Sequence, residues 1–310
     1  MIDLGPARIG LGLASLGRPG YLNLGHGDDL GEDRSVAALR ARSFDVLDAA
    51  YAAGVRYLDA ARSYGRAEDF LGAWLDDRAP DGVTVGSKWG YVYTADWEVA
   101  ADPPEVKHHD ADTLRRQLSE TRERLSDHLD LYQIHSATPD SGVLENDAVL
   151  GELRALRASG VAIGVSVSGT SQADTIDRAV ALGMFDAVQA TWNLHERAAG
   201  PALGRAHEAG LKVIVKEALA NGRLGPRAPA AELATAASAL GSTPDAVALA
   251  AVLAQPFTDV VLSGVSTRET LASNLAAAGL QLSDEVLAAL APLEEDSEEY
   301  WSTRSALPWN

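Results

Sequence analysis

Short apolar, β-branched runs alternate with longer stretches rich in Ala, Leu and Arg along most of the chain. The short runs have the length and composition of buried strands, and the longer stretches carry apolar residues near helical spacing. Clear helical stretches are residues 42–53, 112–125, 149–158 and 230–240. The expected strands are residues 8–13, 56–60, 84–87, 129–134, 162–168, 187–191, 212–217 and 260–263.

Eight strands separated by helices indicate parallel pairing, because a crossover between parallel strands needs a dozen or more residues. Four of the helical stretches are followed by a glycine, the usual left-handed stop: Gly54, Gly160, Gly183 and Gly210. A doubly wound open sheet would give a similar alternation, but eight units in one continuous chain favour closure. We therefore predict an α/β fold: one (β/α)8 TIM barrel domain spanning residues 1–310.

Three segments depart from this pattern. Residues 18–34 are rich in Gly and Asp, and residues 89–110 combine several aromatics with two prolines. The tail, residues 294–310, begins acidic and ends with two tryptophans. Long connections inside a compact domain are often functional. We expect the first two to be extra loops and the tail to lie over the C-terminal face of the barrel.

Composition narrows the functional class. The chain has 310 residues, no cysteine and a formal charge of −18. The lack of cysteine excludes disulfides and thiol nucleophiles, and the acidity argues against nucleic-acid binding, which needs clustered Lys and Arg. No apolar run approaches the roughly 20 residues of a membrane span, and the N-terminus lacks a signal-peptide pattern. These features predict a cytoplasmic protein without nucleic-acid or membrane partners.

Four polar residues stand at or just beyond the ends of expected strands: Asp59, Tyr64, Lys88 and His135. In a parallel barrel these strand ends meet at one rim, where polar side chains usually do chemistry. Each residue alone would most often be structural, whereas their joint placement favours catalysis.

The combination suggests a tyrosine that acts as an acid. A free phenol has a pKa of about 10, and a neighbouring ammonium favours the phenolate, making the phenol a better acid. Asp59 would hold Lys88 in place, and His135 could donate a hydrogen bond to a substrate carbonyl. Because no side chain supplies hydride, such a site needs a nicotinamide cofactor.

The sequence motifs around these residues resemble those of the aldo-keto reductases. Residues 54–65, GVRYLDAARSYG, are close to that family's G-x-x-x-x-D-T-A-x-x-Y-G. Further matches follow in family order and span nearly the whole chain: SK at 87–88, LDLYQIH at 129–135, GVS at 164–166, VQ at 188–189, WNL at 192–194, LANGRL at 219–224 and SGVSTR at 263–268 with Asn274.

The resemblance implies a general acid–base role for Tyr64, tuned by Lys88 and Asp59, with His135 orienting the carbonyl. It implies a small carbonyl or alcohol substrate and an extended NADPH, with NADH as the alternative, across the barrel mouth. Arg268 could contact a 2′-phosphate near a helix N-terminus, or be a solvated first-turn residue. The cofactor residues that it implies are Ser166, Gln189, Leu219, Gly222, Leu224, Gly264, Ser266, Thr267, Arg268 and Asn274.

Several positions depart from the family pattern. Val167 replaces the asparagine that often helps to hold the carboxamide, which leaves Ser166 and Gln189, alone or with Ser168. Lys216 and Glu217 stand where many family members have an aromatic residue followed by an S-P-L-A turn. They could form a plain ion pair, or could reach the cofactor or a polar substrate.

Other sequence patterns give weaker evidence for a functional site. Gly10 and Gly12 lack the spacing of a dinucleotide fingerprint, and the pair His108 and His109 has no third ligand at metal spacing. We expect solvated loop histidines and no metal. An enzyme that reduces a carbonyl, or oxidises an alcohol or sugar in reverse, is the favoured function. A cofactor-binding regulatory subunit with little turnover is the alternative, and the sequence does not predict an oligomeric state.

Overall fold

The strands form a closed parallel barrel in the computed structural model, which describes residues 2–99, 101–227 and 229–310. The strand order is β1-β10-β9-β8-β7-β6-β3-β2. All eight expected strands are present, with ends shifted by at most three residues, and the predicted TIM barrel is confirmed. The strands are β1 (Ile9–Gly12), β2 (Tyr57–Asp59), β3 (Thr84–Trp89), β6 (Leu129–Ala137), β7 (Ala162–Val167), β8 (Ala187–Thr191), β9 (Lys212–Lys216) and β10 (Val260–Gly264).

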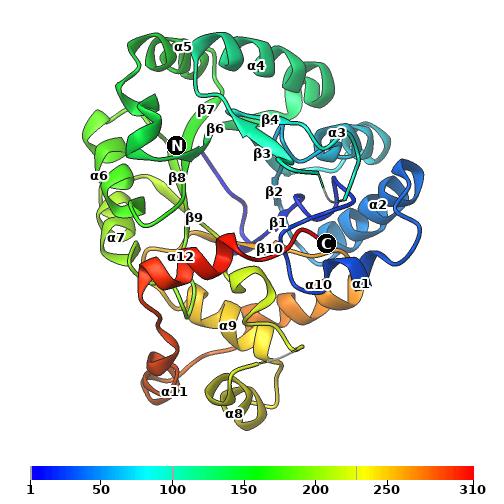
Figure 1. Cartoon of the computed structure of the whole chain (residues 1–310), viewed down its shortest axis with the longest axis vertical. Coiled ribbons are helices and arrows are strands. Elements are labelled where there is room, and N and C mark those ends of the chain that lie inside the picture. The colour runs from blue at the N-terminus through cyan, green and yellow to red at the C-terminus, as the bar shows by residue number, and fades with distance from the viewer. Residues whose placement is uncertain (1, 100, 228) are drawn as a thin grey trace.

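Helices surround the barrel on the outside (Figure 1). The glycines that end four of the helical units have φ between 62° and 104°, which confirms the expected left-handed stops. Most of the helices lie in the connections between strands: α2 (Val36–Ala52), α3 (Ala67–Arg78), α4 (Ala111–Leu125), α5 (Asp147–Ala158), α6 (Gln172–Leu182), α7 (Gly200–Glu208), α8 (Ala231–Ala239) and α9 (Pro244–Leu253). The last strand is followed by α10 (Arg268–Leu275), α11 (Asp284–Ala289) and α12 (Ser297–Ser305).

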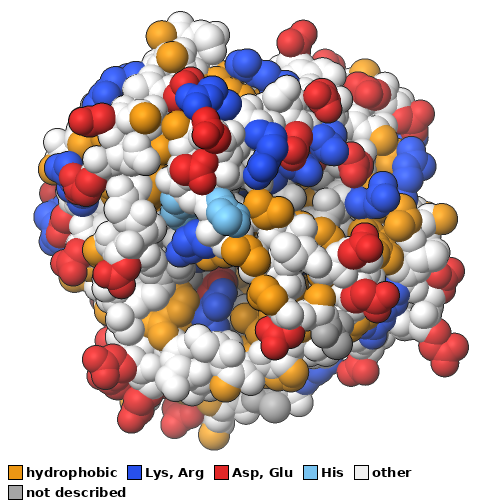
Figure 2. Space-filling model, turned by 45° about the horizontal axis from the view of Figure 1, so that its top comes forward, with side chains coloured by type: hydrophobic (Ala, Val, Ile, Leu, Met, Phe, Trp, Pro, Cys, Tyr) orange, Lys and Arg blue, Asp and Glu red, His pale blue; other side chains and the backbone are white. Residues whose placement is uncertain are grey.

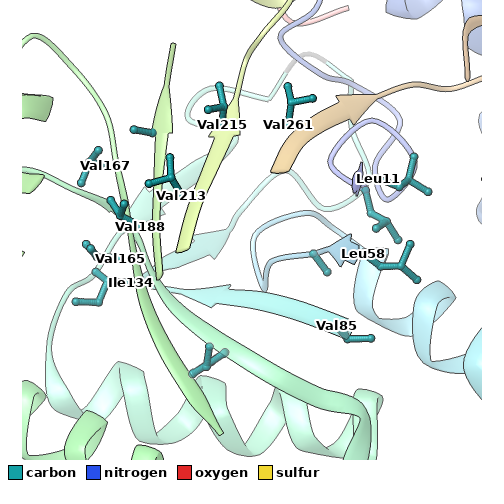
Figure 3. Packing of buried hydrophobic residues seen from close by; sticks show 14 of the residues in the cluster. Leu11, Leu58, Val85, Ile134, Val165, Val167, Val188, Val213, Val215 and Val261 are labelled. Atoms are coloured by element: carbon teal, nitrogen blue, oxygen red, sulfur yellow. The ribbon is translucent and has the colours of Figure 1, made fainter. Parts of the chain in front are cut away.

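Strand side chains alternate between the helices and the barrel interior. Val213 and Val215 belong to the large core between strands and helices, together with strand residues such as Leu58 and Ile134 (Figure 3). Ile214, between the two valines, belongs instead to a smaller interior cluster. The other buried members of that cluster are Leu4, Tyr57, Leu131, Ala187 and Val260. This apolar cluster fills one end of the barrel.

The three exceptional segments have more structure than the sequence led us to expect. Residues 18–34 include the short helix α1 (His26–Leu30). Residues 89–110 are not a plain loop, because β4 (Tyr91–Tyr93) and β5 (Glu105–Lys107) pair as an antiparallel hairpin. Tyr91, Val92 and Val106 suit such a hairpin, but one three-residue strand gives too short an alternation to recognise in sequence.

The tail returns across the barrel as α12, as predicted (Figure 1). Its Tyr300 and Trp301 are buried in a second hydrophobic cluster with Leu194, Leu224 and Leu233. The tail therefore contributes to the core as well as covering the C-terminal face.

Within the described ranges, no single helix is long and apolar enough to cross a membrane. Only α8 and α9 pass that test together, and they are bent by 88° relative to each other. The same residues contain no group of three or more His, Asp or Glu side chains that could hold a metal ion.

Candidate active site

A cavity of about 610 Å³ opens at the C-terminal ends of the strands, where the four polar residues were expected to meet. Asp59, Tyr64 and His135 line it. Its size is that of a small-molecule site. A hollow in the molecular surface contains basic side chains and has histidine at its edge (Figure 2). Strand ends, the segment of residues 18–34 and the tail all contribute to the cavity wall.

Lys88 lies below the cavity surface and joins two of the lining residues. Its fully buried Nζ donates hydrogen bonds to Asp59 Oδ2 and, at 2.9 Å, to the Ala60 carbonyl oxygen. It also donates to Tyr64 Oη at 3.3 Å. A buried ion pair is retained only with good geometry and further hydrogen bonds, and both are present here.

The second oxygen of Asp59 is held by three neutral donors. Asp59 Oδ1 accepts from Tyr57 Oη at 3.1 Å, Gln133 Nε2 at 3.3 Å and Gln189 Nε2 at 3.0 Å. Sequence reasoning missed Tyr57 and Gln133 as part of this site. Each lies two residues before a predicted site residue on the same strand, so strand alternation already puts it inside the barrel.

His135 faces Tyr64 edge-on, with 5.4 Å between ring centroids. Its Nδ1 lies 3.4 Å from the buried hydroxyl of Ser63. With that hydroxyl as donor, the proton of the neutral ring lies on Nε2. Burial, followed by the charges of Lys88 and Lys216, holds the pKa of His135 well below its ordinary value. His135 is therefore neutral near pH 7 and can serve as a hydrogen-bond donor.

The tyrosine differs from the expectation based on sequence. Burial, assisted by the Asp59 carboxylate, raises the pKa of Tyr64 well above its ordinary value, and Arg18 opposes this only in part. The ammonium of Lys88 was expected to lower this pKa. Because Asp59 compensates that charge at contact distance, the pair offers the phenol little net positive charge. Tyr64 thus keeps its proton at neutral pH.

His109 is not a solvated histidine, contrary to expectation. Its Nε2 donates to the His135 carbonyl oxygen at 2.9 Å, and its ring packs edge-on against Trp89. His108 is exposed, as predicted. His109 therefore supports the backbone of the strand that carries His135.

The ten predicted cofactor residues divide into three groups. Gln189, Leu219, Gly222, Gly264 and Ser266 line the cavity. Ser166, Leu224 and Asn274 are fully buried and do not line it. Thr267 and Arg268 also lie outside the cavity wall.

Ser166 faces the barrel interior just below the cavity wall, and its buried hydroxyl has no hydrogen-bond partner among the described residues. Ser168, two residues further along the same direction, lines the cavity instead. Neither the Ser168 hydroxyl nor Gln189 Oε1 has a hydrogen-bond partner within the parts of the chain that the structure describes. These two groups and the Ser166 hydroxyl beneath them are donors and acceptors of the kind that an amide needs.

Arg268 is the first residue of α10 and points away from the cavity. It pairs with Asp45 at 3.1 Å, and both side chains are more than half exposed. Thr267 caps the helix by accepting a hydrogen bond from the Thr270 amide at 3.1 Å. An exposed ion pair is worth at most about 1 kcal/mol, so the observed partner holds Arg268 only weakly.

Lys216 and Glu217 do not pair with each other. Glu217 accepts two hydrogen bonds from the guanidinium of Arg304 in α12, one of them at 2.9 Å from Nε. Sequence offered no signal for this pair, because its members are 87 residues apart. The Arg304–Glu217 pair fastens the tail to the end of β9.

Comparison with known proteins agrees with the fold. The chain is 26% identical to Aldo-keto reductase str7 of Strobilurus tenacellus over 93% of this chain and 88% of that protein. It is 30% identical to the D-threo-aldose 1-dehydrogenase of a Pseudomonas species, over 44% of this chain and 46% of that protein. The structure of the glycerol dehydrogenase of Gluconobacter oxydans shares the fold, with a TM-score of 0.75 at 21% identity and coverage of 94% and 92% of the two chains.

The model of the Aldo/keto reductase family matches residues 8–295, nearly the whole chain. The chain is therefore a member of the aldo/keto reductase family, oxidoreductases that generally use nicotinamide cofactors.

Proposed function

We propose that the protein is an NADPH-dependent oxidoreductase that reduces an aldehyde or ketone to an alcohol, or oxidises an alcohol or sugar in reverse. The main observation that supports this proposal is the position of Lys88. Its Nζ bonds to Asp59 on one side and to Tyr64 Oη, at 3.3 Å, on the other. Tyr64 and His135 then face a cavity with room for a small substrate.

In this mechanism the bound cofactor supplies or accepts the hydride. Tyr64 gives its phenolic proton to the substrate oxygen during reduction and takes it back during oxidation. Lys88 stabilises the phenolate that forms, while Asp59 holds Lys88 in position. His135 donates from Nε2 to the same substrate oxygen and so polarises the carbonyl.

The cofactor would extend from this centre toward the start of α10. The unpartnered Ser168 hydroxyl and Gln189 Oε1 suit the carboxamide of the nicotinamide. Gly264, Ser266 and Thr270 line the other end of the cavity. There Arg268 would leave its weak surface partner Asp45 to bind a 2′-phosphate, which is the basis for preferring NADPH.

The substrate class follows from the cavity and from the relatives. A cavity of about 610 Å³ with both polar and apolar lining residues suits a small carbonyl compound or its alcohol. The similarity to a D-threo-aldose 1-dehydrogenase of a Pseudomonas species supports sugars as substrates in the oxidative direction.

Turnover with purified protein tests the proposal directly. We expect reduced nicotinamide absorbance to fall when NADPH is mixed with aromatic and sugar aldehydes, and to rise with NADP⁺ and the corresponding alcohols. Equilibrium binding of NADPH without turnover of any carbonyl or alcohol would favour a regulatory cofactor-binding protein instead.

A pair of variants tests the cofactor preference. Arg268→Ala should raise the Kd of NADPH by about tenfold or more, as expected for loss of a charged hydrogen bond, and leave NADH nearly unchanged. Asp45→Asn is the matched control, because it frees Arg268 and should leave NADPH binding equal or tighter. Equal effects of Arg268→Ala on both cofactors would remove this residue from the phosphate site.

A further inference from the structure

Lys216 is a cation without a counter-ion in the cavity. It is the last residue of β9 and lines the cavity together with Tyr64 and His135. No carboxylate lies within 4.0 Å of its Nζ, and no acceptor lies within hydrogen-bond distance, for residues 2–99, 101–227 and 229–310.

The other cationic side chains of this region are already paired. Arg18 bonds to Glu105 at 3.1 Å, and Arg227 bonds to Asp29. Lys88 bonds to Asp59. Lys216 differs from these cations in having no carboxylate partner at all, as far as the described residues extend.

The neighbouring carboxylate forms no hydrogen bond with Lys216 and acts on its charge only at longer range. Glu217 receives two hydrogen bonds from Arg304 and a third from Thr191 Oγ1 at 3.3 Å. Arg304 therefore removes from Lys216 the partner that sequence proximity would suggest.

An ammonium that is largely shielded from water is costly unless an anion compensates it. Lys216 lies beside the proposed reaction centre, and burial lowers its pKa, while the charges of Glu217 and Asp59 offset this only in part. A substrate that carries an anion would supply the missing partner within the same cavity.

We propose that Lys216 binds a carboxylate on the substrate, so that the enzyme acts on small aldehydes, or on the matching alcohols, that carry a carboxylate group. This inference rests on the proposed oxidoreductase function. A phosphate group is the poorer candidate, because a dianion is typically held by several charged donors, and Arg18, Arg227 and Arg304 of the described cavity wall each hold a carboxylate already.

The overall charge of the protein makes such a local contact necessary. At a formal charge of −18, the molecule repels small anions at long range. A contact cation inside the cavity can overcome this repulsion, because close charges in a shielded site are screened little.

A matched pair of aldehydes tests the proposal. The substrates are 4-carboxybenzaldehyde and methyl 4-formylbenzoate, which differ in charge at the group remote from the aldehyde. Lys216→Met should lower kcat/KM for the carboxylate by about 10- to 100-fold, the usual range for a charged hydrogen bond. The loss should appear mainly in KM, kcat/KM for the ester should stay within about threefold, and Lys216→Arg should retain most of the preference.

Lys212→Met is the charge control. Lys212 begins the same strand, pairs with Asp259 at 2.9 Å and does not line the cavity. The Lys212→Met variant changes the net charge of the protein by the same amount as Lys216→Met. It should leave the ratio of kcat/KM between the two aldehydes unchanged.

A binding measurement separates this inference from the proposed function. Wild-type protein should bind benzoate in calorimetry at least tenfold more tightly than Lys216→Met, whether or not either aldehyde is reduced, while the Kd of NADPH stays within about threefold. Equal losses on acid and ester, or benzoate binding that is indifferent to Lys216, would overturn the carboxylate assignment. A parallel loss of NADPH affinity would place Lys216 at the cofactor instead. Failure to reduce the ester with intact benzoate selectivity would count against the reductase and not against the anion site.

Discussion

The two ends of the barrel interior are built from the same strands but have opposite chemistry. At the N-terminal end, Tyr57, Leu131 and Ile214 belong to a buried apolar cluster. Two residues further along those strands stand Asp59, Gln133 and Lys216. One strand period therefore separates a hydrophobic plug from a polar site.

This difference separates stability from chemistry in space. The apolar cluster at the N-terminal end buries hydrophobic surface and needs few hydrogen-bond partners. Tyr57 connects it to the polar site, because its hydroxyl donates a hydrogen bond to Asp59 at 3.1 Å. The C-terminal end of the barrel interior holds charged side chains that are costly to bury and are kept in place by their mutual contacts. Substitutions at the two ends should consequently produce different kinds of loss.

Breaking the buried ion pair should have the largest effect, because it damages both properties. Lys88→Met leaves Asp59 buried without its cation, which typically costs about 3–5 kcal/mol of unfolding free energy. It should also abolish most carbonyl reduction. Urea unfolding and steady-state kinetics on the same preparation would measure the two losses.

The double variant Asp59→Asn/Lys88→Met sharpens this result. Removing both charges should restore much of the unfolding free energy while activity stays low, since no cation remains beside Tyr64. Recovery of activity together with stability would show that the pair acts only as a structural element.

A truncation in the apolar cluster at the N-terminal end should reduce stability alone. Ile214→Ala leaves a cavity in a packed interior and should lower the unfolding free energy by about 2–5 kcal/mol. The kcat/KM of the folded fraction should stay within a few-fold of the wild type. A large loss of kcat with little loss of stability would contradict the separation of the two ends.

The smallest expected effect is a pH dependence of KM, caused by Lys216 at the C-terminal end of the barrel interior. Burial lowers the pKa of Lys216 to about 8; Arg304 and Lys88 act in the same direction, whereas Glu217 and Asp59 oppose it. The ammonium is therefore present below about pH 8 and lost above it, while a substrate carboxylate stays ionised throughout.

The KM for 4-carboxybenzaldehyde should accordingly rise by about tenfold per pH unit above that value until the neutral-amine limit is reached. The KM for the methyl ester should show no such rise, and the neutral His135 contributes no charge change in this range. Identical pH profiles for the two aldehydes would assign the titration to a step other than anion binding.

The strands and the main site could be predicted because their signals are local. Alternation and left-handed glycines mark each βα unit, and a residue at a strand end reaches the barrel mouth wherever the barrel closes. Asp59, Tyr64, Lys88 and His135 meet for that reason.

What sequence missed depends on side-chain direction and on long-range contacts. The hydrogen bonds of Tyr57 and Gln133 to Asp59 Oδ1 depend on how the strands close into the barrel. The Arg304–Glu217 pair depends on how the tail crosses the barrel, and the raised pKa of Tyr64 depends on how fully its surroundings exclude water. None of these can be read from spacing along the chain.

The central claim is that the hydroxyl of Tyr64 transfers the proton in carbonyl reduction, and one comparison tests it most directly. The measurement is kcat at saturating NADPH for Tyr64→Phe, with Tyr51→Phe as the control because Tyr51 lies on α2 and its hydroxyl contacts only the backbone of Asp81. We expect Tyr64→Phe to lose about 10²–10⁴-fold in kcat, the usual contribution of general acid catalysis, with NADPH affinity and unfolding free energy nearly unchanged. The control should behave as the wild type. Turnover by Tyr64→Phe within a few-fold of the wild type would contradict the account.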